Sequence, residues 1–302
     1  MKNIVMAVGL FVAATANAAL AQERGRGPWF ASIAGGAVYQ GDAGAKDGAG
    51  EFSVTRGFVQ PGIGYAFDRQ NRALLSVGAG RTDYAFDDGL VLDGGEPWSG
   101  IRDLRVSAPV FFAPSERVSA IVIPGVRWNT ELGADLDEGR TEGVLAGASY
   151  KFGDSLSLGP GVGWFSKLGG GTTVFPILLI DWNITDTLNL STGRGLAASQ
   201  GPGLMLSYKL SDSIRLGLSG RYEESRFRLD GNGSVAGGVG EDSSFPLIVS
   251  VAYQPNPAAS VSAFVGAEFG GKLRVRDASG TTLDETGYET APVLGAAFRF
   301  RF

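Results

Sequence analysis

The chain of 302 residues contains no cysteine and no histidine. Without cysteine there is no disulfide, no thiolate nucleophile and no thiolate metal site. Without histidine the usual general base near neutral pH and the commonest metal ligand are both missing. Ser-His-Asp and Cys-His catalysis are therefore excluded, and so is His-ligated zinc or haem. We expect no enzymatic activity, no cofactor and no metal site.

Charged residues are also scarce, at 19% of the chain, and the formal net charge is −5. A nucleic-acid partner would require a basic face, so this balance argues against one. Glycine is abundant by comparison, with 47 residues. This is about twice the usual share of glycine.

The first 21 residues have the composition of a secretory signal peptide. Lys2 provides the positive start, residues 4–14 form an apolar core, and small residues end the segment at Ala21. A cut after Ala18 is the competing choice, because it also follows small residues. The apolar core is too short to predict a spanning helix. We expect residues 1–21 to be removed on export and residues 22–302 to form one domain.

The rest of the chain alternates apolar and polar residues with period two, which is typical of β-strands with two different faces. No apolar run approaches the length of a spanning helix, and the longest covers residues 174–180. In residues 261–269, for example, Val261, Val265 and Phe269 share one face and Ser262, Gly266 and Glu268 the other. The expected strands are 29–39, 51–67, 73–86, 101–113, 118–130, 142–152, 156–166, 172–183, 188–195, 203–210, 214–229, 245–254, 260–276 and 287–302.

Short polar turns alternate with long connections between these strands. An aromatic strand end, a tight turn and a new strand recur in residues 150–158, 182–190 and 208–216. Six short turns and seven long connections give 14 strands, or 12 if residues 188–195 and 203–210 are misread.

The pattern favours an all-β, transmembrane, antiparallel up-and-down β-barrel, in which short turns lie on one side of the membrane. A soluble β-sandwich is the competing architecture, and the long strands argue against it. Aromatic residues gather at the short-turn ends, as expected for a membrane interface. This set comprises Tyr65, Phe67, Phe112, Tyr150, Phe152, Trp182, Tyr208 and Tyr253, and a second set comprises Trp128, Trp164, Tyr222 and Phe269.

The chain ends with aromatic residues at alternate positions, Phe298, Phe300 and Phe302. This ending resembles the C-terminal assembly signal of Gram-negative outer-membrane β-barrel proteins, which the barrel-assembly machinery recognises in that family. Within it, the chain most resembles uncharacterised barrels of proteobacterial outer membranes, known as a domain of unknown function. The resemblance implies an outer-membrane location, with membrane lipid, lipopolysaccharide and the assembly machinery as partners.

Charged residues on the polar strand faces are expected to line the lumen, because Arg and Lys cost about 2–4 kcal/mol each near the membrane midplane. Basic residues outnumber acidic ones in this set, so the interior is expected to be basic with a mild preference for anions. The long loops, in contrast, are acidic. The expected lumen-lining residues are Arg56, Asp103, Arg105, Arg127, Lys151, Asp181, Lys209, Arg215, Arg221, Glu223, Glu268, Lys272, Arg274, Arg299 and Arg301.

Two functions fit this reading. The first is a passive or weakly selective channel for small hydrophilic solutes. The second is a structural or envelope-assembly barrel whose lumen is closed, either by internal ion pairs or by the inward-pointing Phe165, Phe175, Ile177 and Leu179. No connection is clearly long enough to fold into a pore. The acidic loops either bind divalent cations that bridge lipopolysaccharide or form a solvated surface.

Overall fold

The computed structural model describes residues 27–46, 50–87, 89–90, 92, 94, 96–192 and 203–302. The expected signal peptide, residues 1–21, lies outside the described residues. Within the described residues, no helix is long and apolar enough to cross a membrane. The described elements are β1 (Trp29–Gly44), β2 (Glu51–Ala66), β3 (Arg72–Phe86), β4 (Gly100–Ser107), β5 (Val110–Ser115), β6 (Val118–Glu131), η1 (Asp137–Gly139), β7 (Arg140–Phe152), β8 (Leu156–Ser166), β9 (Thr172–Asn183), β10 (Leu188–Thr192), β11 (Gly203–Lys209), β12 (Ile214–Arg221), β13 (Glu223–Arg228), β14 (Val239–Asn256), β15 (Ala259–Arg276), β16 (Thr282–Gly287) and β17 (Ala291–Arg301).

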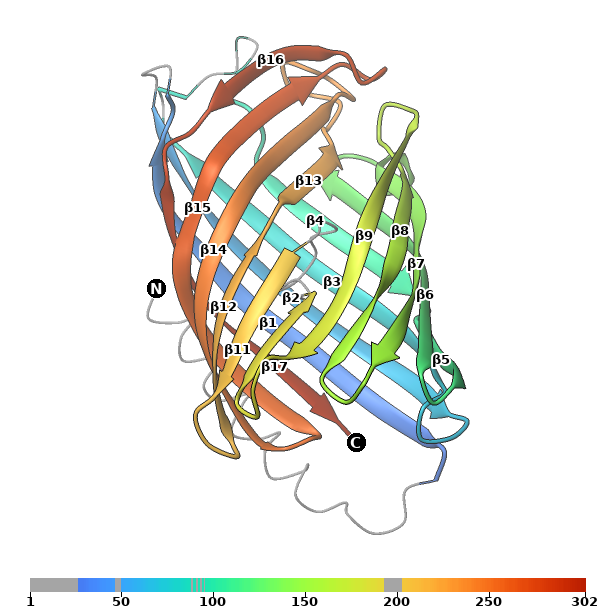
Figure 1. Ribbon diagram of the computed structural model, residues 1–302. Coiled ribbons are helices and arrows are strands. Elements are labelled where there is room, and N and C mark those ends of the chain that lie inside the picture. The colour runs from blue at the N-terminus through green and yellow to red at the C-terminus, as the bar shows by residue number, and fades with distance from the viewer. Residues whose placement is uncertain are drawn as a thin grey trace.

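These segments form a closed antiparallel β-barrel of 14 strands. Three barrel strands are interrupted, and each consists of two consecutive segments: β4 with β5, β12 with β13, and β16 with β17 (Figure 1). The barrel closes where β1 pairs with β17, from Ser32 opposite Arg301 to Gln40 opposite Val293. The predicted count of 14 strands is confirmed. The alternative of 12 strands is wrong, because β10 and β11 pair with each other along Leu188–Thr192.

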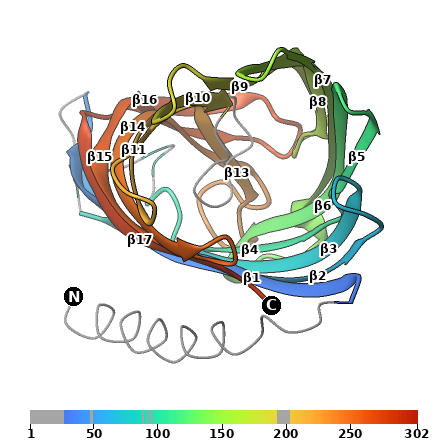
Figure 2. The same ribbon diagram turned by 60° about the horizontal axis from the view of Figure 1, so that its bottom comes forward.

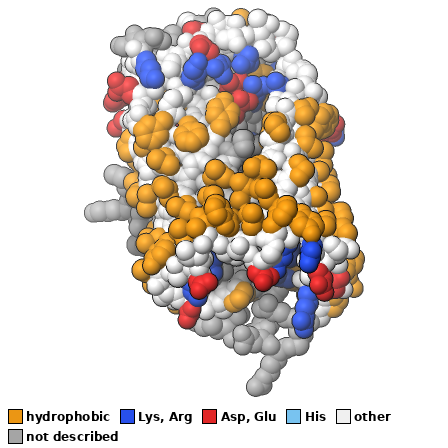
Figure 3. Space-filling view, viewed as in Figure 1, with side chains coloured by type: hydrophobic (Ala, Val, Ile, Leu, Met, Phe, Trp, Pro, Cys, Tyr) orange, Lys and Arg blue, Asp and Glu red, His pale blue; other side chains and the backbone are white. Residues whose placement is uncertain are grey.

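The outer wall carries the apolar half of the alternation. Val174 is 62% exposed, Val265 60% and Leu294 55%, which is unusual for large apolar side chains unless they face lipid. Figure 3 shows these side chains as a belt across the wall, with charged side chains above and below it. All but one of the predicted short-turn aromatics are exposed: Phe67, Phe112, Tyr150, Phe152, Trp182, Tyr208 and Tyr253. The exception, Tyr65, is half-buried.

β13 stays paired with β14 from Glu223 to Arg228 but bends inward, so that its end reaches across the lumen. Its residue Arg228 pairs in parallel with Thr130 of β6, although five barrel strands (β7 to β11) separate them along the wall. The Asn129 side-chain amide fixes this contact by donating to the Arg226 carbonyl oxygen at 2.7 Å. Figure 2 shows β13 inside the ring of strands. The upper lumen, at the end with the long connections, is therefore divided into two compartments.

One compartment is filled by an apolar cluster on the inward faces of β2, β4, β13 and β15. Its members include Phe52, Phe227 and Leu273, each at most 1% exposed. The connection between β3 and β4 adds Leu90, Leu92 and Trp98 to the same cluster. The expectation that no connection folds into the lumen is therefore wrong. These apolar residues draw an otherwise Gly- and Asp-rich loop inward by removing their surface from water.

Candidate functional site

Below this apolar cluster, the lumen contains a cavity lined by charged residues. Its volume is about 110 Å³, which is room for several water molecules. Apolar side chains, among them Phe58, Ile248, Phe264 and Val293, form part of the lining. The charged and polar residues come from β2, β3, β4, β6, β13, β14 and β15, and include Arg56, Tyr84, Asp103, Arg105, Arg127, Asn129, Glu223, Ser225, Asp242, Ser244 and Glu268. Arg81, Thr82 and Glu224 also contact the cavity.

The first wall of this cavity, from β4 and β6, has one carboxylate between two guanidinium groups. Asp103 accepts from Arg105 Nε at 2.9 Å with one carboxylate oxygen, and its other oxygen binds Arg127. Register explains the grouping, because Arg105 lies directly opposite Arg127 across the β4–β6 pair. All three side chains are at most 18% exposed. The first wall therefore has two positive charges against one negative charge, which leaves an excess of one positive charge.

The second wall, from β2, β14 and β15, has one guanidinium group between two carboxylates. Arg56 donates to Glu268 at 3.0 Å and to Asp242 at 3.2 Å. Asp242 also accepts from the Tyr84 hydroxyl at 2.9 Å and the Tyr288 hydroxyl at 3.0 Å. Both carboxylate oxygens of Asp242 thus accept hydrogen bonds, as the burial of a charged group requires.

Glu223 joins this second wall from β13 and pairs with Arg221 of β12. The second wall then has three carboxylates, from Glu223, Asp242 and Glu268, against two guanidinium groups. The second wall therefore has an excess of one negative charge. When Arg221, the partner of Glu223, is counted, the two walls together are neutral, so the expected basic interior is not found in this cavity.

Asp242 decides this balance, and the sequence analysis missed it. The predicted strand began at residue 245, whereas β14 begins at Val239. Residues 240–244 are small, polar or acidic yet buried, so no apolar alternation marks them as strand. A carboxylate that is buried among side chains from other strands leaves no signal in its local sequence.

Lys272 and Arg274 lie on the outer face of the wall rather than in the lumen. A β-bulge places Gly270 and Gly271 opposite the single residue Ser244, and Gly270 adopts a φ of 60°. The extra residue reverses the alternation above it. Leu273 consequently points into the apolar cluster, and its neighbours Lys272 and Arg274 point outward.

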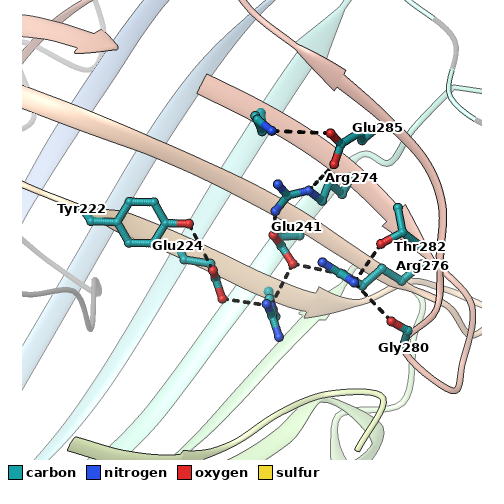
Figure 4. Close-up of polar contacts among 10 residues, drawn as sticks. Tyr222, Glu224, Glu241, Arg274, Arg276, Gly280, Thr282 and Glu285 are labelled. Carbon is teal, nitrogen blue, oxygen red and sulfur yellow. Dashed lines mark hydrogen bonds and ion pairs between the residues drawn. The ribbon is translucent and has the colours of Figure 1, made fainter. Parts of the chain in front are cut away.

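On this outer face, Glu241 is enclosed by three arginines, as Figure 4 shows in part. Arg226 lies 2.9 Å from the carboxylate, Arg276 lies 3.1 Å from it, and Arg274 also binds it. Glu241 has no exposed side-chain surface. Burial acts to raise the pKa of Glu241, but the arginines outweigh it and hold the pKa below its ordinary value. This cluster joins β13, β14 and β15 above the membrane belt.

The remaining candidates lie nearer the short-turn end, on the inward strand faces. Lys151 and Asp181 flank Ser157 of β8, and Lys209 lies opposite Arg215. Arg221 and Arg299 line a second cavity of about 230 Å³ with small serine and alanine side chains. The Arg301 guanidinium stacks 3.9 Å from the centre of the Phe30 ring. Basic residues thus gather at this mouth, away from the neutral cavity.

The C-terminal aromatics occupy the outward face of the closing strand. Phe298 and Phe300 alternate with Arg299 and Arg301, and their ring centroids lie 5.7 Å apart. Phe302 is tied to β1, because its amide donates to the Ala31 carbonyl oxygen at 2.8 Å. These residues complete the seam between the first and last strands.

No protein-family model and no curated protein matches this chain. Several solved structures are similar over most of its length. The translocator domain of autotransporter NalP from Neisseria meningitidis is 13% identical, with 99% of this chain and 98% of that chain covered and a TM-score of 0.37. The Pseudomonas putida toluene transporter TodX is 9% identical, with 92% and 91% covered and a TM-score of 0.44. A KdgM porin is 9% identical, with 90% and 99% covered and a TM-score of 0.36. Likeness at this level carries no argument about function, so the barrel assignment depends on the strand pairings described above.

Proposed function

We propose that this chain is an integral outer-membrane β-barrel that acts as a passive or weakly selective channel for small hydrophilic solutes. The apolar belt and the exposed aromatics at the short-turn ends support a membrane location. The resemblance of the C-terminal strand to outer-membrane assembly signals supports the outer membrane in particular. Membrane lipid and lipopolysaccharide are then the surroundings of the wall, and the barrel-assembly machinery is the partner that recognises Phe302.

The observation that carries the channel is the charged cavity inside a closed wall. An ion pair in a dry interior costs desolvation energy that its attraction barely repays, so pairs buried solely for stability are often replaceable by apolar residues. Here several charged side chains instead surround a space large enough for water. Such groups can exchange their contacts with one another for contacts with a passing solute.

A barrel with a closed lumen and a structural role is the second candidate. It is favoured by the apolar cluster around Phe227 and by the contact between β13 and β6, which together fill one upper compartment. This compartment does not include the inward faces of β7, β8 and β9. The two candidates differ in whether a solute passes between β13 and these strands.

Single-channel conductance in planar bilayers separates the two. The chain is expressed with its own N-terminal segment, purified from membranes and checked for folding by its heat-dependent electrophoretic mobility. We expect discrete conductance steps with similar permeability for small cations and anions, because the cavity is neutral. A folded barrel that gives no steps would exclude the channel and support the closed barrel. Recovery of the chain from the soluble periplasm would exclude both.

A further inference from the structure

The search for a ligand class begins with the separation of charge across the central cavity. The wall of Asp103, Arg105 and Arg127 has an excess positive charge, and the wall of Arg56, Arg221, Glu223, Asp242 and Glu268 has an excess negative charge. The two walls come from different strands, and their residues line one space, except for Arg221, which pairs with Glu223 from outside this lining. The cavity is therefore neutral as a whole but strongly dipolar.

A solute with a single charge meets one favourable wall and one unfavourable wall. A small anion near Arg105 would also approach Glu223 and Glu268, and a small cation near Glu223 would also approach Arg105 and Arg127. Charge repulsion in a partly desolvated site costs more than in water, because the effective dielectric constant is lower. The cavity therefore discriminates against both kinds of ion.

A solute that carries both charges satisfies both walls. Its carboxylate accepts charge-assisted hydrogen bonds from the guanidinium groups of Arg105 and Arg127, which present planar pairs of donors. Its ammonium group donates to the carboxylates of Glu223 and Glu268. The aliphatic part contacts the apolar lining from Phe58, Ile248, Phe264 and Val293. A small number of polar groups that converge on a partly apolar space is typical of a small-molecule binding site.

We propose that the central cavity is a binding site for small zwitterions of the α-amino-acid type. This inference deepens the proposed channel and rests on it for the route by which solutes reach the cavity. It assigns Arg105 and Glu223 as the specificity residues. Without Arg105, the positive wall becomes neutral, because Arg127 still balances Asp103. Without Glu223, the negative wall becomes neutral, because Arg56 and Arg221 still balance Asp242 and Glu268.

The test compares three probes of similar size at neutral pH: glycine, acetate and methylammonium. Binding to the detergent-solubilised barrel is measured by isothermal titration calorimetry, which does not depend on transport. We expect glycine to bind at least about tenfold more tightly than either ion, which is about 1.4 kcal/mol. Equal binding of the three probes, or no binding of glycine, would overturn the site.

Two substitutions should change this preference in opposite directions. Arg105→Gln removes the preference for glycine over methylammonium, because the positive wall becomes neutral. Glu223→Gln removes the preference for glycine over acetate. Lys272→Gln is the matched control, because Lys272 lies on the outer face with a side chain that is 47% exposed, and it should leave all three affinities unchanged. Loss of binding by the same factor for all three probes in both variants would indicate a structural defect and contradict the assigned roles.

The same protein in planar bilayers separates this inference from the proposed channel. If conductance steps appear, glycine should interrupt the current in a concentration-dependent way and acetate should not. Steps without any effect of glycine would support the channel and contradict the zwitterion site. If no steps appear, the channel is contradicted, and the calorimetric preference alone decides the site.

Discussion

The inward faces of the barrel differ sharply between two groups of strands. On β1–β6 and β13–β17, here called the filled side, large residues such as Phe52, Phe227 and Tyr288 are almost completely buried in the lumen. On β7–β9, here called the glycine side, several inward positions are glycines. Gly147 lies opposite Gly161, and Gly163 lies beside the Phe175 ring. The outward faces of both sides carry the same exposed apolar residues.

The difference shows that the membrane determines only one of the two strand faces. Lipid requires apolar residues outside on every strand, so the outward sets are alike. The lumen makes no such demand, so one side can be packed like a soluble core, and the other can carry glycines next to rings that are only partly buried, such as Phe165 and Phe175. Closure of the upper lumen is therefore a property of the filled side. The first two predictions test whether the two sides respond differently to matched changes.

The largest difference is expected when an inward aromatic ring is removed. Phe227→Ala deletes a ring with no exposed surface that contacts Trp98 at a centroid distance of 5.0 Å, so it should lower the free energy of unfolding by about 3–5 kcal/mol. Phe175→Ala on the glycine side should cost less than half of that, because its ring is only partly buried. Urea unfolding in lipid vesicles, monitored by tryptophan fluorescence, measures both. Equal losses would show that the two sides are packed alike.

A smaller difference is expected when a methyl group is added to a glycine. A Cβ at Gly271 would lie 2.0 Å from the Tyr288 ring, and a Cβ at Gly163 would lie 2.5 Å from the Phe175 ring. Tyr288 is fully buried and held by Asp242, so Gly271→Ala should cost about 1–3 kcal/mol. The Phe175 ring can move into the lumen, so Gly163→Ala should change the unfolding free energy little. A cost at Gly163 as large as that at Gly271 would mean that the glycine side is also tightly packed.

The outward strand faces show where sequence reasoning succeeds, and the bulge at Gly270 shows where it fails. Period-two alternation predicted the barrel, its strand number and the outward residues, because lipid imposes the same pattern on each strand. It did not predict the position of Lys272 and Arg274, since one extra residue at Gly270 reverses the facing of everything above it. A bulge changes one hydrogen-bonded pair and leaves the residue types on both sides unaltered.

The composition of the cavity was predictable only in part. Arg56, Asp103, Arg105, Arg127, Glu223 and Glu268 belonged to the expected lumen set and do line the cavity. Asp242 did not belong to it, although it lines the same cavity and pairs with Arg56. Its burial depends on Arg56, Tyr84 and Tyr288, which are far from it in the sequence. Long-range pairing of this kind cannot be inferred from one chain without its fold.

Acid should weaken the filled side through Glu241. Its pKa is held below the ordinary 4.5, so its contribution to stability is present above that pH and lost as the pH falls through the lower folded value. The unfolding free energy of the unmodified chain should therefore fall as the pH is lowered below the ordinary value of 4.5. Glu241→Gln should be less stable at pH 7, because three arginines lose their carboxylate, and should show less of this acid-dependent loss. An identical acid dependence in the variant would exclude Glu241 as its source.

The smallest effects are expected at the exposed turns next to the short-turn mouth. Lys151 pairs with Asp154 at 3.3 Å and Lys209 pairs with Asp212 at 2.7 Å, yet both aspartates are fully exposed. Ion pairs in water gain little attraction and lose side-chain freedom. Asp154→Asn and Asp212→Asn should therefore leave the urea midpoint unchanged within error, at low and at high salt. A measurable loss that disappears at high salt would mean that charge, rather than strand pairing alone, stabilises these turns. The contrast between the filled and glycine sides would then have to include these turns as well as the lumen.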